Sequence, residues 1–203
     1  MTPDQERPTP EPSLGAIVLA GGRSSRFGRD KLVEPIDGRP LLDYSIVAVR
    51  ALTDEIVVVA APDADPVVPD GVTLVHDARP FEGPLAALDA GLTASHADRV
   101  VVVGGDMPTL VPAVLGRLLG ALGAAADASA AILEVDGSPR PILPLALARE
   151  PASAAVRRLL DSGERRLGAL LDVLEVRIVP SAEWRFDDPE GRTLRDIDTP
   201  GDL

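Results

Sequence analysis

The chain has 203 residues, 45% of them hydrophobic and 26% charged, a composition typical of a globular protein with one good-sized core. It has no cysteine, which excludes disulfides and thiolate metal ligands, and its 2 histidines argue against a zinc site. The net charge of -12 argues against general nucleic-acid binding and against attachment to anionic membranes.

The N-terminal residues combine prolines with acidic side chains, so we expect residues 1–13 to form a disordered tail ahead of one domain at 14–203. This tail lacks the apolar core of a signal peptide. The chain also lacks an uninterrupted apolar run of about 18 residues, the length expected of a transmembrane helix. We therefore expect a cytoplasmic protein with a small-molecule or protein partner.

Residues 16–19 are a short apolar run that predicts a buried strand, and the loop after them is the most informative part of the chain. Its glycines allow tight turns and bring backbone amides close to a ligand. Its cations make it locally positive in an acidic chain, so the loop is suited to a polyphosphate. The glycines are Gly21, Gly22 and Gly28, and the cations are Arg23, Arg26, Arg29 and Lys31.

Two well-known phosphate loops do not fit this segment. A P-loop needs Ser or Thr directly after Gly-Lys, whereas Gly28 and Lys31 are separated here and Leu32 follows the lysine. The glycine spacing also differs from the G-x-G-x-x-G of dinucleotide-binding proteins. A solvated surface turn is the alternative interpretation, but the position directly after a strand favours the ligand-binding crevice of an α/β sheet.

Strands and helices are predicted to alternate along the rest of the chain. Apolar and β-branched runs predict strands at 56–59, 72–75, 100–103, 130–133, 143–147 and 176–179. Helical spacing predicts helices at 40–52, 84–97 and 111–123, and a helical pair over 152–173 that breaks at Gly163. Pro144 is expected to confine its strand to an edge or a bulge. This order predicts a single three-layer α/β/α domain with a mostly parallel, Rossmann-like sheet.

Two aspartates follow predicted strands. Asp106 comes after the most hydrophobic strand, within Gly-Gly-Asp-Met-Pro, where a carboxylate would lie in the ligand crevice and offer Mg²⁺ a hard oxygen ligand. The alternative is that Asp106 caps the helix that starts near Pro112. Asp77 comes just after the strand at 72–75 and is expected at the same edge of the sheet as Asp106. The alternative interpretation is that Asp77 only stabilises a turn. His76 is assigned no role.

The motifs taken together resemble the MobA-like nucleotidyltransferases, most closely those that act as molybdenum cofactor guanylyltransferases. Residues 19–31 match L-A-G-G-x-S-x-R-x-G-x-D-K, and Gly105-Asp106-Met107-Pro108 matches the family's magnesium-binding aspartate element. The G-P-L at 83–85, the G-E-R-R at 163–166 and the D-x-D-T-P-x-D-L at 196–203 are further shared elements. The resemblance spans 14–203 and implies the fold of the nucleotide-diphospho-sugar transferases.

The resemblance implies roles for particular residues. Leu19, Ala20, Gly21, Gly22, Ser24, Lys31, Asp77 and Asp106 would bind the nucleotide, with Asp77 at the base or ribose. Arg26 and Lys31 would neutralise charge on the leaving group, and Asp106 would hold Mg²⁺, the one cofactor expected. Asp198 is a weaker second candidate for the metal or the acceptor. Arg165 and Arg166 are given no firm role, because solvated surface arginines explain the pair better than an anionic acceptor does. Arg140 is given none, because residues 138–141 match only loosely the family stretch that contacts the acceptor.

The implied reaction transfers GMP from GTP to the phosphate of molybdopterin and releases pyrophosphate. Gly21-Gly22 favours guanine, because the related cytidylyltransferases carry L-A-A-G. The chain departs from some members at Ala60-Ala61-Pro62, where they have an asparagine that helps to hold the nucleotide. The alternatives are cytidylyl transfer, nucleotidyl transfer to a sugar phosphate or phospholactate, and a non-catalytic nucleotide-binding protein. Proteins that make or accept the molybdenum cofactor are possible partners.

Overall fold

An eight-stranded, mostly parallel sheet forms the centre of the molecule, in the order β10-β7-β9-β6-β1-β4-β5, with β8 paired to β7. The computed structural model describes residues 11–21, 35–36, 38–77, 83–124, 127–135, 138–139 and 142–197. The strands of this sheet are β1 (Leu14–Ala20), β4 (Ile56–Ala60), β5 (Val72–His76), β6 (Arg99–Gly104), β7 (Ala130–Val135), β8 (Ser138–Pro139), β9 (Leu145–Ala148) and β10 (Val176–Val179). A separate small hairpin joins β2 (Pro35–Ile36) to β3 (Arg39–Pro40).

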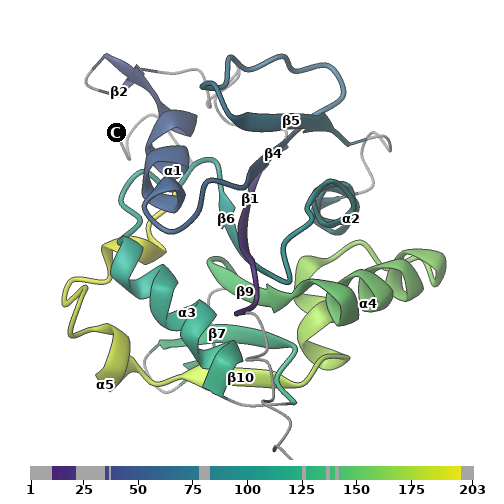
Figure 1. Ribbon diagram of the computed structural model, residues 1–203, viewed down its shortest axis with the longest axis vertical. Helices are drawn as coiled ribbons and strands as arrows, with labels where there is room; N and C mark the ends of the chain where they lie inside the picture. Colours follow the sequence, from purple (N-terminus) through teal and green to yellow (C-terminus); the bar gives the residue numbers. More distant parts are fainter. Residues whose placement is uncertain are drawn as a thin grey trace, which may run out of the picture.

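Helices cover both faces of the sheet, which gives three layers (Figure 1). One face carries α1 (Leu41–Arg50), α3 (Pro112–Ala124) and the short α5 (Ser181–Trp184). The other carries α2 (Pro84–Ala94), α4 (Arg149–Asp161) and the 3₁₀ helix η2 (Leu167–Asp172). A further 3₁₀ turn, η3 (Arg192–Leu194), lies near the C-terminus. The predicted three-layer α/β/α fold with a mostly parallel sheet is confirmed.

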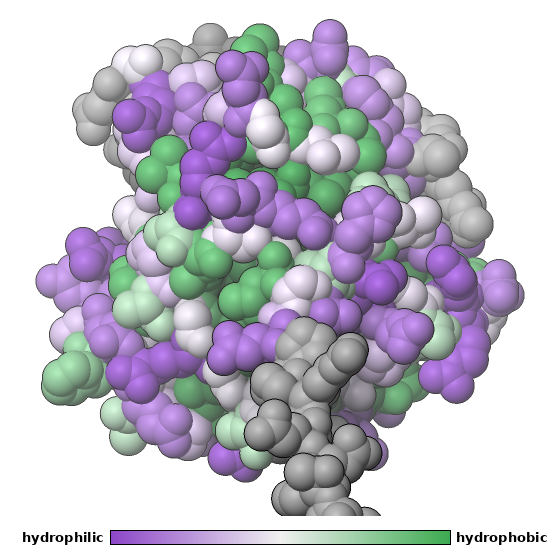
Figure 2. Space-filling view, viewed as in Figure 1, coloured by the Kyte–Doolittle hydropathy of each residue, from purple (hydrophilic) through white to green (hydrophobic). Residues whose placement is uncertain are grey.

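The central strands β1, β4 and β9 are apolar throughout because each face of the sheet packs against helices. In β1, Ala16 and Val18 pack into the core under α1 and α3, whereas Ile17 packs into the core under α2. All five residues of β4 are buried. A strand covered on both faces has a continuous apolar sequence rather than an alternating one. Figure 2 shows hydrophilic side chains over much of the molecular surface, with hydrophobic surface in patches between them.

The position expected for the strand near Pro144 is wrong. The strand β9 lies inside the sheet, antiparallel to β6 on one side and to β7 on the other. It begins at Leu145, so the proline precedes the ladder and no strand hydrogen bond needs its missing N–H. The helical pair predicted over 152–173 is confirmed with its break at Gly163, although the second member is a 3₁₀ helix rather than an α-helix.

The order in which the chain adds strands to the sheet reverses at β1. From β1 the chain moves outward to β4 and β5, and then crosses over to form β6 on the opposite side of β1. Ligands of open α/β sheets bind at such a switch point, outside the carboxyl ends of the strands. Within the described ranges, no helix has the length and apolar character needed to cross a membrane.

Candidate active site

The carboxyl ends of β6, β1, β4 and β5 lie next to one another along one edge of the sheet. The N–H of Gly105 donates to the carbonyl of Leu19 at 2.9 Å. This hydrogen bond extends the pairing of β6 with β1 by one residue beyond the end of β6. The N–H of Asp77 donates to the carbonyl of Ala60 at 3.0 Å and does the same for β5 and β4. Asp106 therefore follows β6 directly beside the point where the glycine-rich loop leaves β1.

The turn that carries Asp106 is tight. A Cβ atom on Gly104 would collide with Oδ1 of Asp106. The Asp106 carboxylate therefore packs against Gly104, which has to be glycine for the carboxylate to stay in this position. The N–H of Gly104 lies 3.3 Å from Sδ of Met107, whose side chain closes the turn from the inside. Asp106 is partly exposed, whereas Gly104, Gly105 and Met107 are buried. The backbone of the turn is thus held in the interior while the Asp106 side chain stays partly exposed.

Ser45, on the buried face of α1, supports this turn from below. Its hydroxyl lies 2.9 Å from the carbonyl oxygen of Gly104 and 3.2 Å from that of Met107. Its side chain is fully buried. The two carbonyls flank Gly105-Asp106, and a buried carbonyl without a donor costs free energy, so the serine satisfies the turn rather than merely filling space. Ser45 was not predicted from the sequence, although a serine within an apolar helical stripe was a signal that could have identified it.

The C-terminal segment returns to the same turn. The N–H of Ile197 donates to the carbonyl of Asp106 at 2.9 Å, and the Ile197 side chain is buried. Asp198 is the next residue along the chain and lies outside the described ranges, as do Gly22, Ser24, Arg26, Lys31 and Arg140. Of the predicted nucleotide-binding residues, the structure describes Leu19, Ala20, Gly21, Asp77 and Asp106. It brings these five together at the carboxyl ends of adjacent strands.

The start of α2 contacts the 164–166 turn at close range. Gly83 has a φ of 84°, and a Cβ there would lie 2.9 Å from the carbonyl oxygen of Arg165. Pro84 occupies the first turn of α2, where its fixed φ suits a helix and its missing N–H costs nothing. The N–H of Leu85 donates to the same Arg165 carbonyl at 3.4 Å. The G-P-L element therefore packs α2 against the 164–166 turn.

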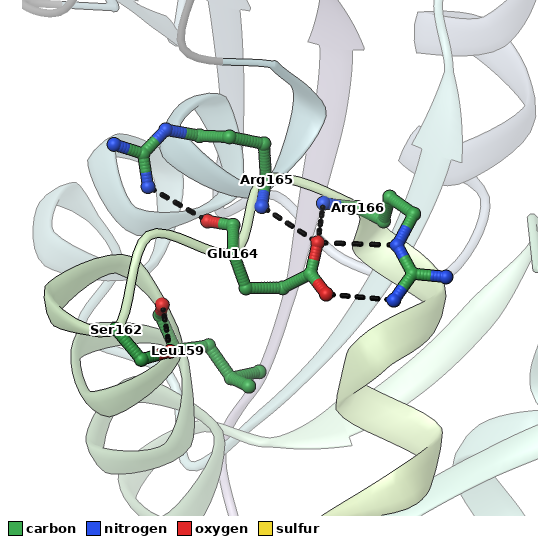
Figure 3. A network of polar contacts seen from close by, with 5 residues as sticks. All are labelled: Leu159, Ser162, Glu164, Arg165 and Arg166. Atoms are coloured by element: carbon green, nitrogen blue, oxygen red, sulfur yellow. Dashed lines mark hydrogen bonds and ion pairs between the residues drawn. The ribbon is translucent and has the colours of Figure 1, made fainter.

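Glu164 organises that turn (Figure 3). Its carboxylate accepts from Nη2 of Arg166 at 2.7 Å and from the N–H groups of Arg165 and Arg166 at 2.8 and 2.9 Å. The hydrogen bonds from Arg166, followed by that from the Arg165 N–H, lower the pKa of Glu164 from 4.5 to about 2. The Arg165 guanidinium donates to the carbonyl oxygens of Leu160 and Glu164, so it caps the end of α4.

His76 also has a structural contact. Its Nε2 lies 2.9 Å from the carbonyl oxygen of Ala64, in the segment between β4 and β5. This contact ties the segment to the end of β5, in agreement with the absence of a functional assignment for His76. Its neighbour Asp77 is partly buried and follows β5 at the edge of the sheet.

A hard divalent cation fits the chemistry of this edge. Asp106 presents a carboxylate, and carboxylate oxygens together with substrate phosphates are the usual ligands of Mg²⁺. Across the described part of the chain, His, Cys, Asp and Glu form no group of three or more that would enclose a metal ion.

Residues 16–177 match the model of the MobA-like NTP transferase domain. The chain belongs to this family. It is therefore a member of a nucleotidyltransferase family, and the resemblance identified from its motifs is confirmed.

MobA-like relatives cover nearly the whole chain. A probable molybdenum cofactor guanylyltransferase of Chloroflexus aggregans is 34% identical over 201 residues, which are 94% of this chain and 91% of that protein. Among solved structures, the molybdopterin-guanine dinucleotide biosynthesis protein A of Archaeoglobus fulgidus has a TM-score of 0.75 and 25% identity, covering 93% of this chain and 94% of its own. A manganese complex of a Mycobacterium tuberculosis protein has a TM-score of 0.60 and 19% identity, with coverage of 83% and 88%.

Proposed function

We propose that this protein is a molybdenum cofactor guanylyltransferase, which transfers GMP from GTP to the phosphate of molybdopterin and releases pyrophosphate. One observation carries the proposal. Asp106 lies at the switch point of the sheet, beside the start of the glycine-rich loop, with the C-terminal segment bonded to its backbone. The names of relatives that align with nearly the whole chain support the same activity.

In this proposal the chain acts by positioning and by neutralising charge. The amides of Gly21 and Gly22 bind the triphosphate, and Arg26 and Lys31 stabilise the negative charge that develops on pyrophosphate. Asp106, with Asp198 as a second candidate, holds Mg²⁺. When bound, this ion would neutralise negative charge that develops on the phosphate groups during displacement. The acceptor phosphate is already an anion, so this chain needs no general base to activate it.

Base selection is assigned to the start of the glycine-rich loop. Gly21 distinguishes the L-A-G-G of guanylyltransferases from the L-A-A-G of cytidylyltransferases, and Asp77 would contact the base or ribose. A Cβ on Gly21 would lie 3.6 Å from the backbone nitrogen of Ala61, which is an ordinary contact. Gly21→Ala should therefore fold, so its effect on base preference can be measured separately from stability.

The first experiment measures thermal shifts with GTP, CTP, ATP and UTP, each with and without Mg²⁺. A nucleotide at 100 times its dissociation constant stabilises by about 2.7 kcal/mol, which should raise Tm by roughly 5–10 °C for a chain of this size. We expect a magnesium-dependent shift with GTP, followed by pyrophosphate release when molybdopterin is added. Gly21→Ala should weaken the response to GTP relative to CTP.

Three outcomes would change the assignment. A shift with CTP alone would move the protein to cytidylyl transfer. Turnover with a sugar phosphate or phospholactate, but not with molybdopterin, would show that the acceptor is that compound and not molybdopterin. Nucleotide binding without pyrophosphate release in the presence of any of these acceptors would indicate a non-catalytic member of the family.

A further inference from the structure

The loop that follows β6, residues 105–111, is bonded at several points to the C-terminal segment, residues 188–197. We call residues 105–111 the Asp106 loop. The hydroxyl of Thr109 donates to the carbonyl of Arg192 at 2.7 Å. The N–H of Val111 donates to Oγ1 of Thr193 at 3.1 Å, and the N–H of Ile197 donates to the carbonyl of Asp106 at 2.9 Å. The C-terminal segment thus contacts the loop at Asp106 and again near the start of α3.

A buried carboxylate holds Thr193 in place. Asp188 has no exposed surface, and its Oδ2 accepts from the N–H of Thr193 at 2.7 Å. Its other oxygen, Oδ1, lies 3.7 Å from Nε of Arg192. Burial raises the pKa of Asp188, but hydrogen bonds from the Thr193 and Arg192 backbones and from the Thr193 hydroxyl outweigh burial and lower it. The Thr193 hydroxyl therefore links a buried charge to the backbone of the Asp106 loop.

We call the contacts of Asp188, Thr193 and their neighbours with the Asp106 loop the clasp. The clasp is itself anchored to the core of the protein. Trp184 in α5 is fully buried, and its Nε1 donates to the carbonyl of Glu134 in β7 at 2.9 Å. The N–H of Asp188 donates to the Trp184 carbonyl at 3.2 Å, and Gly191 turns the chain with a φ of 66°. Thr193 is fully buried as well. Contacts to the core therefore position Thr193 in addition to its contact with the Asp106 loop.

We propose that Thr193 is a positioning residue for nucleotidyl transfer, because it holds the Asp106 loop in register with the C-terminal segment, and that Asp188 acts through it. This inference rests on the proposed function. A displacement of about 1 Å in a reacting group can lower turnover by about 100-fold, so a clasp that fixes the backbone at Asp106 and in the residues after it controls the rate without touching substrate.

Thr193→Val tests the clasp, and Thr193→Ser is the matched control. Valine keeps the shape but removes the hydroxyl that accepts from Val111, whereas serine keeps the hydroxyl. In Thr193→Val we expect hydrogen exchange of the Val111 amide to accelerate by about tenfold or more. We also expect about tenfold weaker Mn²⁺ binding by calorimetry, and kcat lowered about 10- to 100-fold with KM for GTP within about twofold. Thr193→Ser should stay close to the unsubstituted protein in all three.

Thr109→Val provides a second variant in case Thr193→Val unfolds, because Thr109 is exposed and its loss should leave the core intact. Emission from Trp184, the single tryptophan, reports whether α5 stays docked. If Thr193→Val and Thr109→Val lower Tm but leave Mn²⁺ affinity and kcat unchanged, the clasp is only structural and the inference is overturned. Weaker Mn²⁺ binding in a protein that transfers no guanylyl group would retain the clasp and reject the proposed function.

Discussion

At the scale of single residues, Asp106 combines a fixed backbone with a carboxylate at the open edge of the sheet. Gly104 leaves room for that carboxylate, and Ser45 holds the carbonyls on either side of it. The turn therefore restricts where the charge can lie before any ligand arrives. Preorganised charge of this kind contributes to catalysis because little reorganisation is needed during the reaction.

Asp106→Asn should remove activity while keeping the fold. The amide retains the size of the side chain but loses the negative charge that a divalent cation requires. We expect guanylyl transfer to fall by about 100-fold or more, with Tm within a few degrees of the unsubstituted value. Asp161→Asn, at an exposed position on α4, is the control and should leave turnover unchanged. Near-normal turnover in Asp106→Asn would contradict the assignment.

Ser45→Ala should destabilise the protein more than an ordinary surface change. The substitution removes the one hydroxyl donor that the carbonyls of Gly104 and Met107 share, which costs about 1–3 kcal/mol in unfolding free energy. Chemical denaturation measures this loss. Ser153→Ala makes the same chemical change on α4, where Ser153 is only partly buried, and should stay within about 0.5 kcal/mol. Equal effects at the two positions would show that the contacts of Ser45 contribute nothing.

At the scale of elements, the junction between β5 and α2 depends on one backbone conformation. Gly83 has a positive φ, and its missing Cβ lets the start of α2 approach the Arg165 carbonyl. Glu164 in turn holds the backbone around Arg165 through its hydrogen bonds. The G-P-L element at 83–85 and the G-E-R-R element at 163–166 therefore form one packing contact, although they lie 80 residues apart in the sequence.

Glycine-to-alanine changes at two positions should have opposite effects. Gly83→Ala combines an unfavourable φ with a close contact to the Arg165 oxygen, and we expect a loss of about 1–3 kcal/mol. Gly120→Ala lies within α3, where a Cβ meets no atom within 4 Å, so it should stabilise by about 0.5–1 kcal/mol. Denaturant unfolding of both variants tests this difference, and stabilisation by Gly83→Ala would refute the account of the junction.

At the scale of the whole molecule, carboxylates with lowered pKa values join segments that are distant in sequence. Burial raises the pKa of Glu55, but hydrogen bonds from Ser95 and from the backbone of residues 96–97 outweigh it. Hydrogen bonds from Ser13 lower the pKa of Asp98, with the backbone N–H contributing more than the hydroxyl. These bonds join the start of β1 to the start of β6. Together with Asp188 and Glu164, these groups hold the chain at well-separated points.

Stability should therefore fall in acid. A group with a lowered folded-state pKa contributes stability above its unfolded pKa, and this contribution is lost as the pH falls toward the folded value. We expect Tm to be nearly constant near neutral pH and to decrease below about pH 4.5, the ordinary value of Glu164. Asp98→Asn should flatten the decrease, whereas Asp63→Asn in the exposed segment after β4 should not. An identical acid slope in Asp98→Asn would contradict the role of the Ser13 contact.

The layers and the main ligand edge could be predicted because both depend on local patterns. Continuous apolar strands that alternate with amphipathic helices specify a covered parallel sheet, and residues after parallel strands must lie at one edge. The position of Asp77 and Asp106 at one edge of the sheet was predicted in this way, and their roles in binding stay a prediction. Ser45 was missed because its partners, the carbonyls of Gly104 and Met107, are 59 and 62 residues away and belong to the backbone. Pro144 was assigned to an edge because the start of β9 at Leu145 depends on its neighbours in the sheet.

The amino-acid order alone specified the elements, their alternation and the chemical character of the glycine-rich loop, because each depends on neighbouring residues. Folding in three dimensions added the contacts that position those elements: Ser45 under the Asp106 turn, the Arg165 carbonyl at the start of α2, and the hydroxyl of Thr193 against the Asp106 loop. Such contacts join backbone groups to distant side chains. A backbone N–H or carbonyl is present at nearly every position, so its partner becomes identifiable only when the chain has folded.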